Sequence, residues 1–326
     1  MAFEIEFGIL AVIGIVLASE VVIGRAIDLS KRFGISDFFI GLTVVSIGTS
    51  FPEISSHVFG SLHILADSSL RLDISNIIFG TNIGSNLIQI TLVIGVVGLL
   101  TVLRAHRRFF EKDYLLMLGA ILLLYLLASD GVVSQVEGIF LAGLYVVYMF
   151  SLLRKERAER DLRKANGNVY EKLSKKVVVD VGMILGGLVL LMVSADQAIT
   201  SSVFVVKTFG LDGSVIGAFV IGVASVMPEF ISAVRAAMKD SQGMSLGTLV
   251  GSNITNPLLA IGLGASITNY TVSANILNFD LPFWFVASLA PLALFWRKGA
   301  LSRRGAMVLI FIYVLYIVWK LEFLQG

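Results

Sequence analysis

Residues 48–53 read Gly-Thr-Ser-Phe-Pro-Glu, and residues 224–229 read Ala-Ser-Val-Met-Pro-Glu. Each stretch lies inside a long apolar segment of the chain. A carboxylate at membrane depth costs about 3 kcal/mol or more unless it is paired, and such a residue marks a functional site by default. A proline there also leaves backbone carbonyls that lipid cannot satisfy. Because this costly combination occurs twice, we predict that Glu53 and Glu229 belong to a functional site inside a membrane.

The composition is that of a membrane protein with many spans. The chain has 326 residues, of which 56% are hydrophobic and 15% are charged, whereas a soluble domain has roughly 25% charged residues. The mean hydropathy is +0.89. Apolar stretches of about 20 residues, the length that crosses a hydrocarbon core, recur along the whole sequence. We therefore predict an all-α membrane protein without a large soluble domain. The lack of cysteine excludes disulfides and thiolate ligands.

Ten membrane spans are predicted from the apolar pattern. The loops that follow the odd-numbered spans hold most of the 25 basic residues, which indicates that these loops are cytoplasmic. Both termini are therefore expected outside the cell membrane, and the basic loop 154–176 is expected inside. This loop is interpreted as a solvated linker, with a regulatory or anionic-lipid contact as the alternative and no support for nucleic-acid binding. The predicted spans are 5–27, 36–60, 74–102, 113–129, 133–153, 177–198, 213–235, 243–267, 280–296 and 304–323.

The sequence contains an internal repeat. The Pro-Glu pair that ends at Glu53 recurs at Glu229, and the flanking residues match without a gap. The next helix repeats as well, because residues 80–86, Gly-Thr-Asn-Ile-Gly-Ser-Asn, match residues 247–253, Gly-Thr-Leu-Val-Gly-Ser-Asn. Each half has five predicted spans, and an odd number turns the second copy upside down in the membrane. Such inverted repeats are a hallmark of secondary transporters.

The repeat divides the chain into three parts. We predict a first five-helix repeat at 1–153, a cytoplasmic linker at 154–176 and a second, inverted five-helix repeat at 177–326. In transporters of this kind, interrupted helices form the binding site near the middle of the membrane. We therefore expect broken helices at a central ion site between the two halves.

The polar residues of the two repeats offer only oxygen ligands. None of the three histidines falls within the matched motifs. An all-oxygen cage with two acids suits Ca²⁺, whereas Zn²⁺ and Cu²⁺ favour nitrogen and sulfur. The rival role is a hydrogen bond, which would go to the residue's own helix for Thr49, Ser50 and Ser225 and to another helix for Ser85, Ser252, Gln89 and Asn256. The candidate ligands are Glu53, Glu229, Thr49, Ser50, Ser85, Gln89, Ser225, Ser252 and Asn256.

Charge balance favours exchange of ions at such a site. Two carboxylates are neutralised by one Ca²⁺, by two Na⁺ or by two protons. An empty, doubly ionised site would be expensive to carry through a dry intermediate. The site is therefore expected to reorient when it is filled and to stall when it is empty, whichever counter-ion it uses.

With these motifs, the chain resembles the Ca²⁺/cation antiporter superfamily, and most closely the prokaryotic Na⁺/Ca²⁺ exchangers. The likeness covers nearly the whole length and is most specific at the two Pro-Glu motifs and the two Gly-Ser-Asn motifs. It implies that Glu53 and Glu229 coordinate Ca²⁺ and that the other candidate ligands help to bind Na⁺ or Ca²⁺. It also implies alternating access, in which the first helix of each half slides across the core. The transported ions would be Ca²⁺ and Na⁺, with H⁺ as the alternative to Na⁺, and no cofactor is implied.

Two positions depart from the pattern of that superfamily. Val226 stands where a serine is usual, and Gln89 stands where Asn or Asp is common. Because Asn256 occupies the matching position in the second half, the core has two acids and no third. A third Na⁺ would bring uncompensated charge, so we expect two Na⁺ or two protons per Ca²⁺ instead of three Na⁺.

Other functions are less well supported. An H⁺-coupled exchanger of the same fold usually carries a Gly-Asn-Ala-x-Glu motif, which this chain lacks, and His57 is interpreted either as a group that tunes proton coupling or as one that faces a water-filled vestibule. A cation channel would need a filter that the sequence does not show. An intramembrane enzyme would need a nucleophile and a base at compatible spacing. We therefore expect a transporter, with the lipid bilayer and the ions as its partners and no protein partner inferred.

Overall fold

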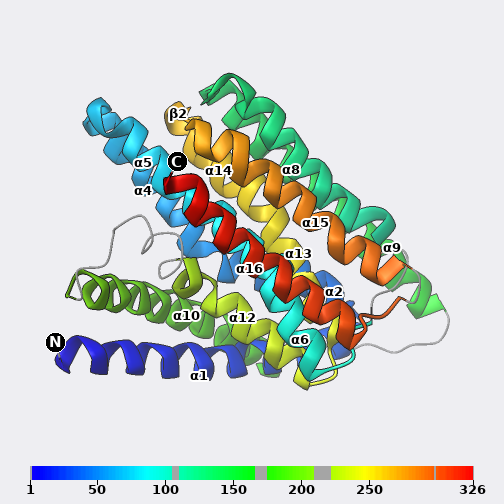
Figure 1. Ribbon diagram of the computed structural model, residues 1–326. Helices are drawn as coiled ribbons and strands as arrows, with labels where there is room; N and C mark the ends of the chain where they lie inside the picture. Colours follow the sequence, from blue (N-terminus) through cyan, green and yellow to red (C-terminus); the bar gives the residue numbers. More distant parts are fainter. Residues whose placement is uncertain (1, 105–109, 166–174, 209–221, 297–298, 326) are drawn as a thin grey trace.

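The computed structural model describes residues 2–104, 110–165, 175–208, 222–296 and 299–325, which are mostly helical (Figure 1). Within these residues, seven helices are long and apolar enough to cross a membrane, and eight if the pair that bends at Ser50 counts as one span. The expected class of all-α membrane protein is therefore confirmed. Helices also coincide with the ten predicted spans, although the first part of 213–235 lies outside the described residues.

The described part of the first half contains two long helices, α1 and α9, a bent helix pair and several helices that contain a π-helical turn. Ser36 caps the bent pair by accepting a hydrogen bond from the backbone N–H of Phe39. The elements are α1 (Ala2–Phe33), α2 (Asp37–Ile40), η1 (Gly41–Val45), α3 (Ser46–Thr49), α4 (Phe51–Ala66), η2 (Ser68–Leu70), α5 (Arg71–Ile88), η3 (Gln89–Val93), α6 (Ile94–Leu100), η4 (Phe110–Tyr114), α8 (Leu115–Leu127), η5 (Ala128–Asp130), β1 (Val132–Val133) and α9 (Gln135–Ala165).

The second half has a similar series of elements. Its short strand β2 pairs antiparallel with β1 of the first half, with Val132 opposite Thr271. The elements are α10 (Lys175–Thr208), α12 (Gly222–Met238), α13 (Gln242–Thr255), η7 (Asn256–Ala260), α14 (Ile261–Ile267), β2 (Tyr270–Thr271), η8 (Ile276–Asp280), α15 (Leu281–Trp296) and α16 (Arg303–Gln325).

The helix that carries Glu53 is broken, as expected, but the helix that carries Glu229 is not. The segments Asp37–Thr49 and Phe51–Ala66 meet at 45° across Ser50, and Pro52 lies in the first turn of α4, where its missing N–H has no intrahelical partner to lose. In contrast, α12 runs through Pro228. Within residues 222–238 the second half therefore shows no break to match the one at Ser50, because a helix supported by neighbouring helices can continue past a proline.

The repeat is visible in the secondary structure. The π-helical turn η3 begins at Gln89 and η7 begins at Asn256, and both follow a helix that contains the Gly-Ser-Asn motif. A π-helical turn contains one extra residue per turn, and such turns occur frequently at functional sites. The two matched amides thus begin equivalent irregular turns near the centre of their halves.

Helices α1 and α10 lie side by side along one edge of the molecule (Figure 1). Their buried apolar side chains belong to a hydrophobic cluster distinct from the main core. At one end of the pair, Asp180 of α10 accepts hydrogen bonds from Arg25 (3.2 Å) and Arg32 (2.9 Å) of α1. The two first helices of the halves therefore form one packed unit.

Small residues bring α13 close to the broken helix. A Cβ atom added at Gly251 would lie 2.7 Å from Cβ of Ser46 and 2.9 Å from Cα of Leu42. Neither atom can move far, because the Leu42 Cα belongs to the backbone and the Ser46 Cβ is bonded directly to it. This close approach, which small residues allow in membrane helices, places Ser252 beside the segment that leads to Glu53.

We expect Gly251→Ala to destabilise the protein, because the added methyl group forces α13 away from η1 and α3. Overpacking of this kind costs about 1–3 kcal/mol, so the thermal unfolding temperature in detergent should fall. The control is Gly143→Ala on α9, where an added Cβ meets no atom within 4 Å, and this change should leave stability unchanged or slightly raised. Equal unfolding temperatures for the two variants would contradict the predicted packing.

Candidate ion-binding site

The two acids of the repeat come together in the structure. Glu53 lies in the first turn of α4 and is 4% exposed, and Glu229 lies on α12 and is 0% exposed. The Glu229 carboxylate is near the hydroxyls of Thr49 and Ser50 and close enough to Glu53 for their charges to interact. Two like charges in one buried site repel each other, so this arrangement needs positive charge to compensate it.

No protein group supplies that compensation among the residues that the structure describes. All four carboxylate oxygens of Glu53 and Glu229 are buried and have no hydrogen-bond partner there. No ion pair joins either acid to a basic residue of the described chain. A buried, uncompensated carboxylate is costly by several kcal/mol, so cations or protons are needed to stabilise both acids.

The predicted hydroxyl ligands are all buried. Among the described residues, Ser50 and Ser252 have no hydrogen-bond partner for their Oγ atoms. Thr49 and Ser85 donate to backbone carbonyls of their own helices, which is the rival role considered for Thr49. A hydroxyl that donates keeps its lone pairs, so these oxygens can still face a cation, and Ser85 lies near the Glu53 carboxylate.

The two candidate amides differ in their hydrogen bonds. The Gln89 oxygen accepts a hydrogen bond from Nδ2 of Asn253 (2.9 Å), which leaves the Gln89 Nε2 group without a partner. The partners of Asn253 fix this direction, because its oxygen accepts from the indole N–H of Trp284 (3.2 Å) and its nitrogen donates to the Leu249 carbonyl (3.0 Å). Gln89 therefore presents an N–H group as well as an oxygen with one lone pair already engaged, and its part in cation binding stays a prediction.

Asn256 has the opposite orientation. Its Nδ2 group donates to Oδ1 of Asn86 (2.9 Å), and its own Oδ1 is buried without a partner. Asn86 and Asn253 thus hold the two candidate amides by interhelical hydrogen bonds. The sequence analysis missed Trp284 and Asn82, although Asn82 precedes Ser85 by three residues and so shares its helix face.

A cavity of ≈ 150 Å³ reaches the first acid. Glu53 and Ser225 both line it, together with His57 and Asn82, and its walls come from α4, α5 and α12. The cavity is large enough for several water molecules, since one water occupies about 30 Å³ of the liquid. It is a route by which a hydrated ion could approach Glu53.

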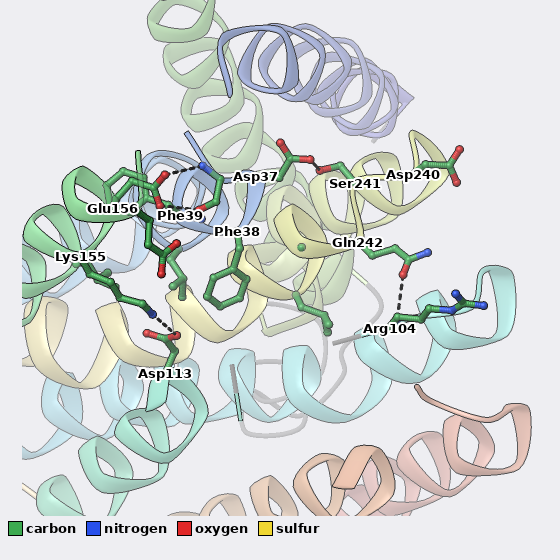
Figure 2. A pocket seen from close by; sticks show the side chains of 16 residues that line it. Asp37, Phe38, Phe39, Arg104, Asp113, Lys155, Glu156, Asp240, Ser241 and Gln242 are labelled. Atoms are coloured by element: carbon green, nitrogen blue, oxygen red, sulfur yellow. Dashed lines mark hydrogen bonds and ion pairs between the residues drawn. The ribbon is translucent and has the colours of Figure 1, made fainter. Parts of the chain in front are cut away.

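A larger cavity of ≈ 810 Å³ lies elsewhere and contains none of the predicted ligands. Figure 2 shows partners for the side chains of Asp37, Asp113 and Glu156 in this cavity. Asp113 contacts Lys155 at 3.6 Å, and Glu156 accepts hydrogen bonds from the backbone and side chain of Ser36, both 2.8 Å. Because these acids are compensated by the protein, this cavity is a weaker candidate for the ion site.

Comparison with known families decides the class of protein. The profile of the sodium/calcium exchanger protein family matches residues 6–154 and 179–322. The chain belongs to this family. It is therefore a multi-pass membrane transporter and not an enzyme, and the predicted resemblance to exchangers is confirmed. Ca²⁺ and Na⁺ as transported ions fit the family.

Individual relatives of this exchanger agree with the assignment. The chain is 26% identical to the sodium/calcium exchanger MaX1 of Methanosarcina acetivorans, over 95% of this chain and 96% of the relative. It is also 26% identical to the inner membrane protein YrbG of Escherichia coli, over 91% and 90% of the two chains. A solved structure of the sodium-calcium exchanger NCX_Mj superimposes with a TM-score of 0.80 over 97% of this chain and 98% of that one, at 22% identity. The last comparison establishes the fold.

Proposed function

We propose that this exchanger exports Ca²⁺ in return for Na⁺ by alternating access. The observation that carries the proposal is the pair of buried acids, Glu53 and Glu229, which come from matched positions of the two halves and have no compensating partner among the described residues. The family assignment supports a cation exchanger, and the acids give it one shared site. Ca²⁺ and Na⁺ would occupy that site at different stages of the transport cycle.

The ligands follow from the groups that are free to face a cation. Ca²⁺ takes six to eight oxygens at about 2.3–2.6 Å, and two carboxylates with several neutral oxygens can provide them. No three His, Cys, Asp or Glu side chains gather in the described part of the chain, so the remaining ligands have to be neutral. In our proposal Gln89 lines the site without binding a cation. The ligands are Glu53, Glu229, Thr49, Ser50, Ser85, Ser225, Ser252 and Asn256.

In the transport cycle, parts of the two halves would move relative to the core of the protein. We infer ten spans, with 1–153 and 177–326 as inverted repeats, both termini outside the cell membrane and the linker 154–176 in the cytoplasm. In this orientation the cavity beside Glu53 opens toward the outside. The packed pair of α1 and α10 would slide across the core to exchange outer access for inner access.

The coupling ion can be tested in proteoliposomes. We expect Ca²⁺ uptake to require an outward Na⁺ gradient and to be indifferent to the membrane potential, because two Na⁺ balance one Ca²⁺ at two acids. The measurement is radioactive Ca²⁺ uptake with Na⁺, pH and potential varied separately. Uptake that ignores Na⁺ and follows the pH gradient would move the assignment to the H⁺-coupled exchanger, and Ca²⁺ flux that needs no counter-ion would indicate a channel.

A further inference from the structure

A chain of buried side-chain hydrogen bonds runs from the proposed ion site to a histidine. Asn256 donates from Nδ2 to Oδ1 of Asn86 at 2.9 Å. Asn86 donates in the same sense to Oδ1 of Asn82 at 3.0 Å. Nδ2 of Asn82 lies 3.1 Å from Nε2 of His57. All four side chains are at most 1% exposed, although His57 and Asn82 also line the cavity beside Glu53.

The far end of this chain indicates which nitrogen of the histidine carries the proton. The Tyr270 hydroxyl lies 2.9 Å from the backbone carbonyl oxygen of His57 and 3.4 Å from Nδ1 of the same residue. The same hydroxyl lies 2.6 Å from Oγ of Ser61, so its single hydrogen is used on the carbonyl or on Ser61. In either case a lone pair of the hydroxyl faces Nδ1, and Nδ1 is the nitrogen that carries hydrogen. Nε2 is then an acceptor, and it can receive the N–H of Asn82.

The hydrogen bonds along the three amides can all run in one direction or all run in the opposite direction. An amide that gives its NH₂ group to one neighbour turns its oxygen to the other. With Nε2 of His57 as an acceptor, Asn82 turns its oxygen to Asn86, and Asn86 turns its oxygen to Asn256. Asn256 is then left with its oxygen free, and this oxygen is the one without a partner. With a donor at Nε2, every amide would reverse and Asn256 would free its NH₂ group instead.

We propose that His57 is a positioning residue that orients the Asn82–Asn86–Asn256 chain, so that Asn256 presents a carbonyl oxygen and not an N–H group to the transported cation. The inference rests on the proposed function, because it assigns a role toward the same ion site. His57 itself touches no ion. It acts at a distance by offering a lone pair where the chain of amides ends.

The second half shows what the opposite arrangement does. There the chain ends at Trp284, whose indole nitrogen can only donate. Asn253 therefore turns its oxygen to Trp284 and its nitrogen to Gln89, and Gln89 is left with a free N–H group. One hydrogen-bond chain ends at an acceptor, His57, and the other ends at a donor, Trp284. This difference explains why the two matched amides, Gln89 and Asn256, expose different atoms.

The test is calorimetric titration of Ca²⁺ into the purified full-length protein. His57→Phe keeps a ring and removes the acceptor, and we expect it to weaken Ca²⁺ binding about 10- to 100-fold, the range found when a residue that orients a metal ligand is lost. His57→Gln places an amide oxygen near the position of Nε2, and we expect binding close to the wild-type value. In proteoliposomes the loss should appear in the KM for Ca²⁺ more than in kcat.

Two outcomes would overturn the inference. One is wild-type Ca²⁺ affinity in His57→Phe, and the other is equally weak binding in His57→Gln and His57→Phe at equal thermal stability. If His57→Phe does not fold, Tyr270→Phe replaces it, because losing the hydroxyl frees Nδ1 to give up its hydrogen, and unchanged affinity would then count against the inference. Glu53→Gln is titrated in parallel. Retained binding in that variant would refute the ion site itself, whereas lost binding there with normal binding in His57→Phe would refute only the role of His57.

Discussion

Glu53→Gln is expected to abolish Na⁺-driven Ca²⁺ uptake. The substitution keeps the size of the side chain and removes one of the two charges that balance Ca²⁺. Losing one member of a buried, charge-compensated set costs about 3–5 kcal/mol, which corresponds to roughly 100-fold to 1,000-fold or more in affinity. Radioactive Ca²⁺ uptake into proteoliposomes measures the effect.

The matched control for this experiment is Glu137→Gln. Glu137 accepts hydrogen bonds from the backbone N–H (2.7 Å) and the hydroxyl (2.8 Å) of Ser134 at the start of α9. Glutamine serves in the same capping arrangement, so this variant should fold and transport normally. Wild-type Ca²⁺ uptake in Glu53→Gln would remove that residue from the proposed ligand set.

Glu229→Gln is expected to change the valence of the ion that the site holds. One remaining carboxylate is neutralised by a single monovalent cation, whereas Ca²⁺ would leave an uncompensated positive charge in a buried site. The variant should therefore lose stabilisation by Ca²⁺ and keep some stabilisation by Na⁺. Since a ligand that binds only the folded state raises thermal stability, the unfolding temperature measured against each ion reports its binding.

The comparison needs a control for ionic strength. Choline chloride at equal ionic strength supplies a cation too large for the site, and it should not raise the unfolding temperature of either protein. The wild type should respond to both Ca²⁺ and Na⁺. A Glu229→Gln variant that Ca²⁺ stabilises as strongly as it stabilises the wild type would show that Glu229 is not a ligand.

Much of the fold was predictable because the dominant signals are local. Long apolar stretches mark the helices, and the predicted span 36–60 coincides with the segments 37–49 and 51–66. The break at Ser50, just before Pro52, also follows from local chemistry. At Pro228 the same reasoning failed, because α12 is supported by neighbouring helices that the sequence around Pro228 does not reveal.

The candidate ligands were predictable as residues, but not the atoms that they present. The motifs indicated that Gln89 and Asn256 are equivalent, since both follow a Gly-Ser-Asn motif by the same spacing. Their difference arises from contacts far apart in the chain, where Trp284 ends one chain of amides and His57 ends the other. Hydrogen-bond direction depends on which donor or acceptor packs at the end of such a chain, and sequence spacing does not determine it.

The most direct test of the shared site is the position of a bound divalent ion. Crystals soaked with Sr²⁺, a heavier analogue of Ca²⁺, would show the ion by its anomalous scattering. We predict one peak in contact with the carboxylates of both Glu53 and Glu229. A peak in the larger cavity beside Asp113 and Glu156, or two carboxylates that hold no ion between them at saturating Sr²⁺, would contradict the account.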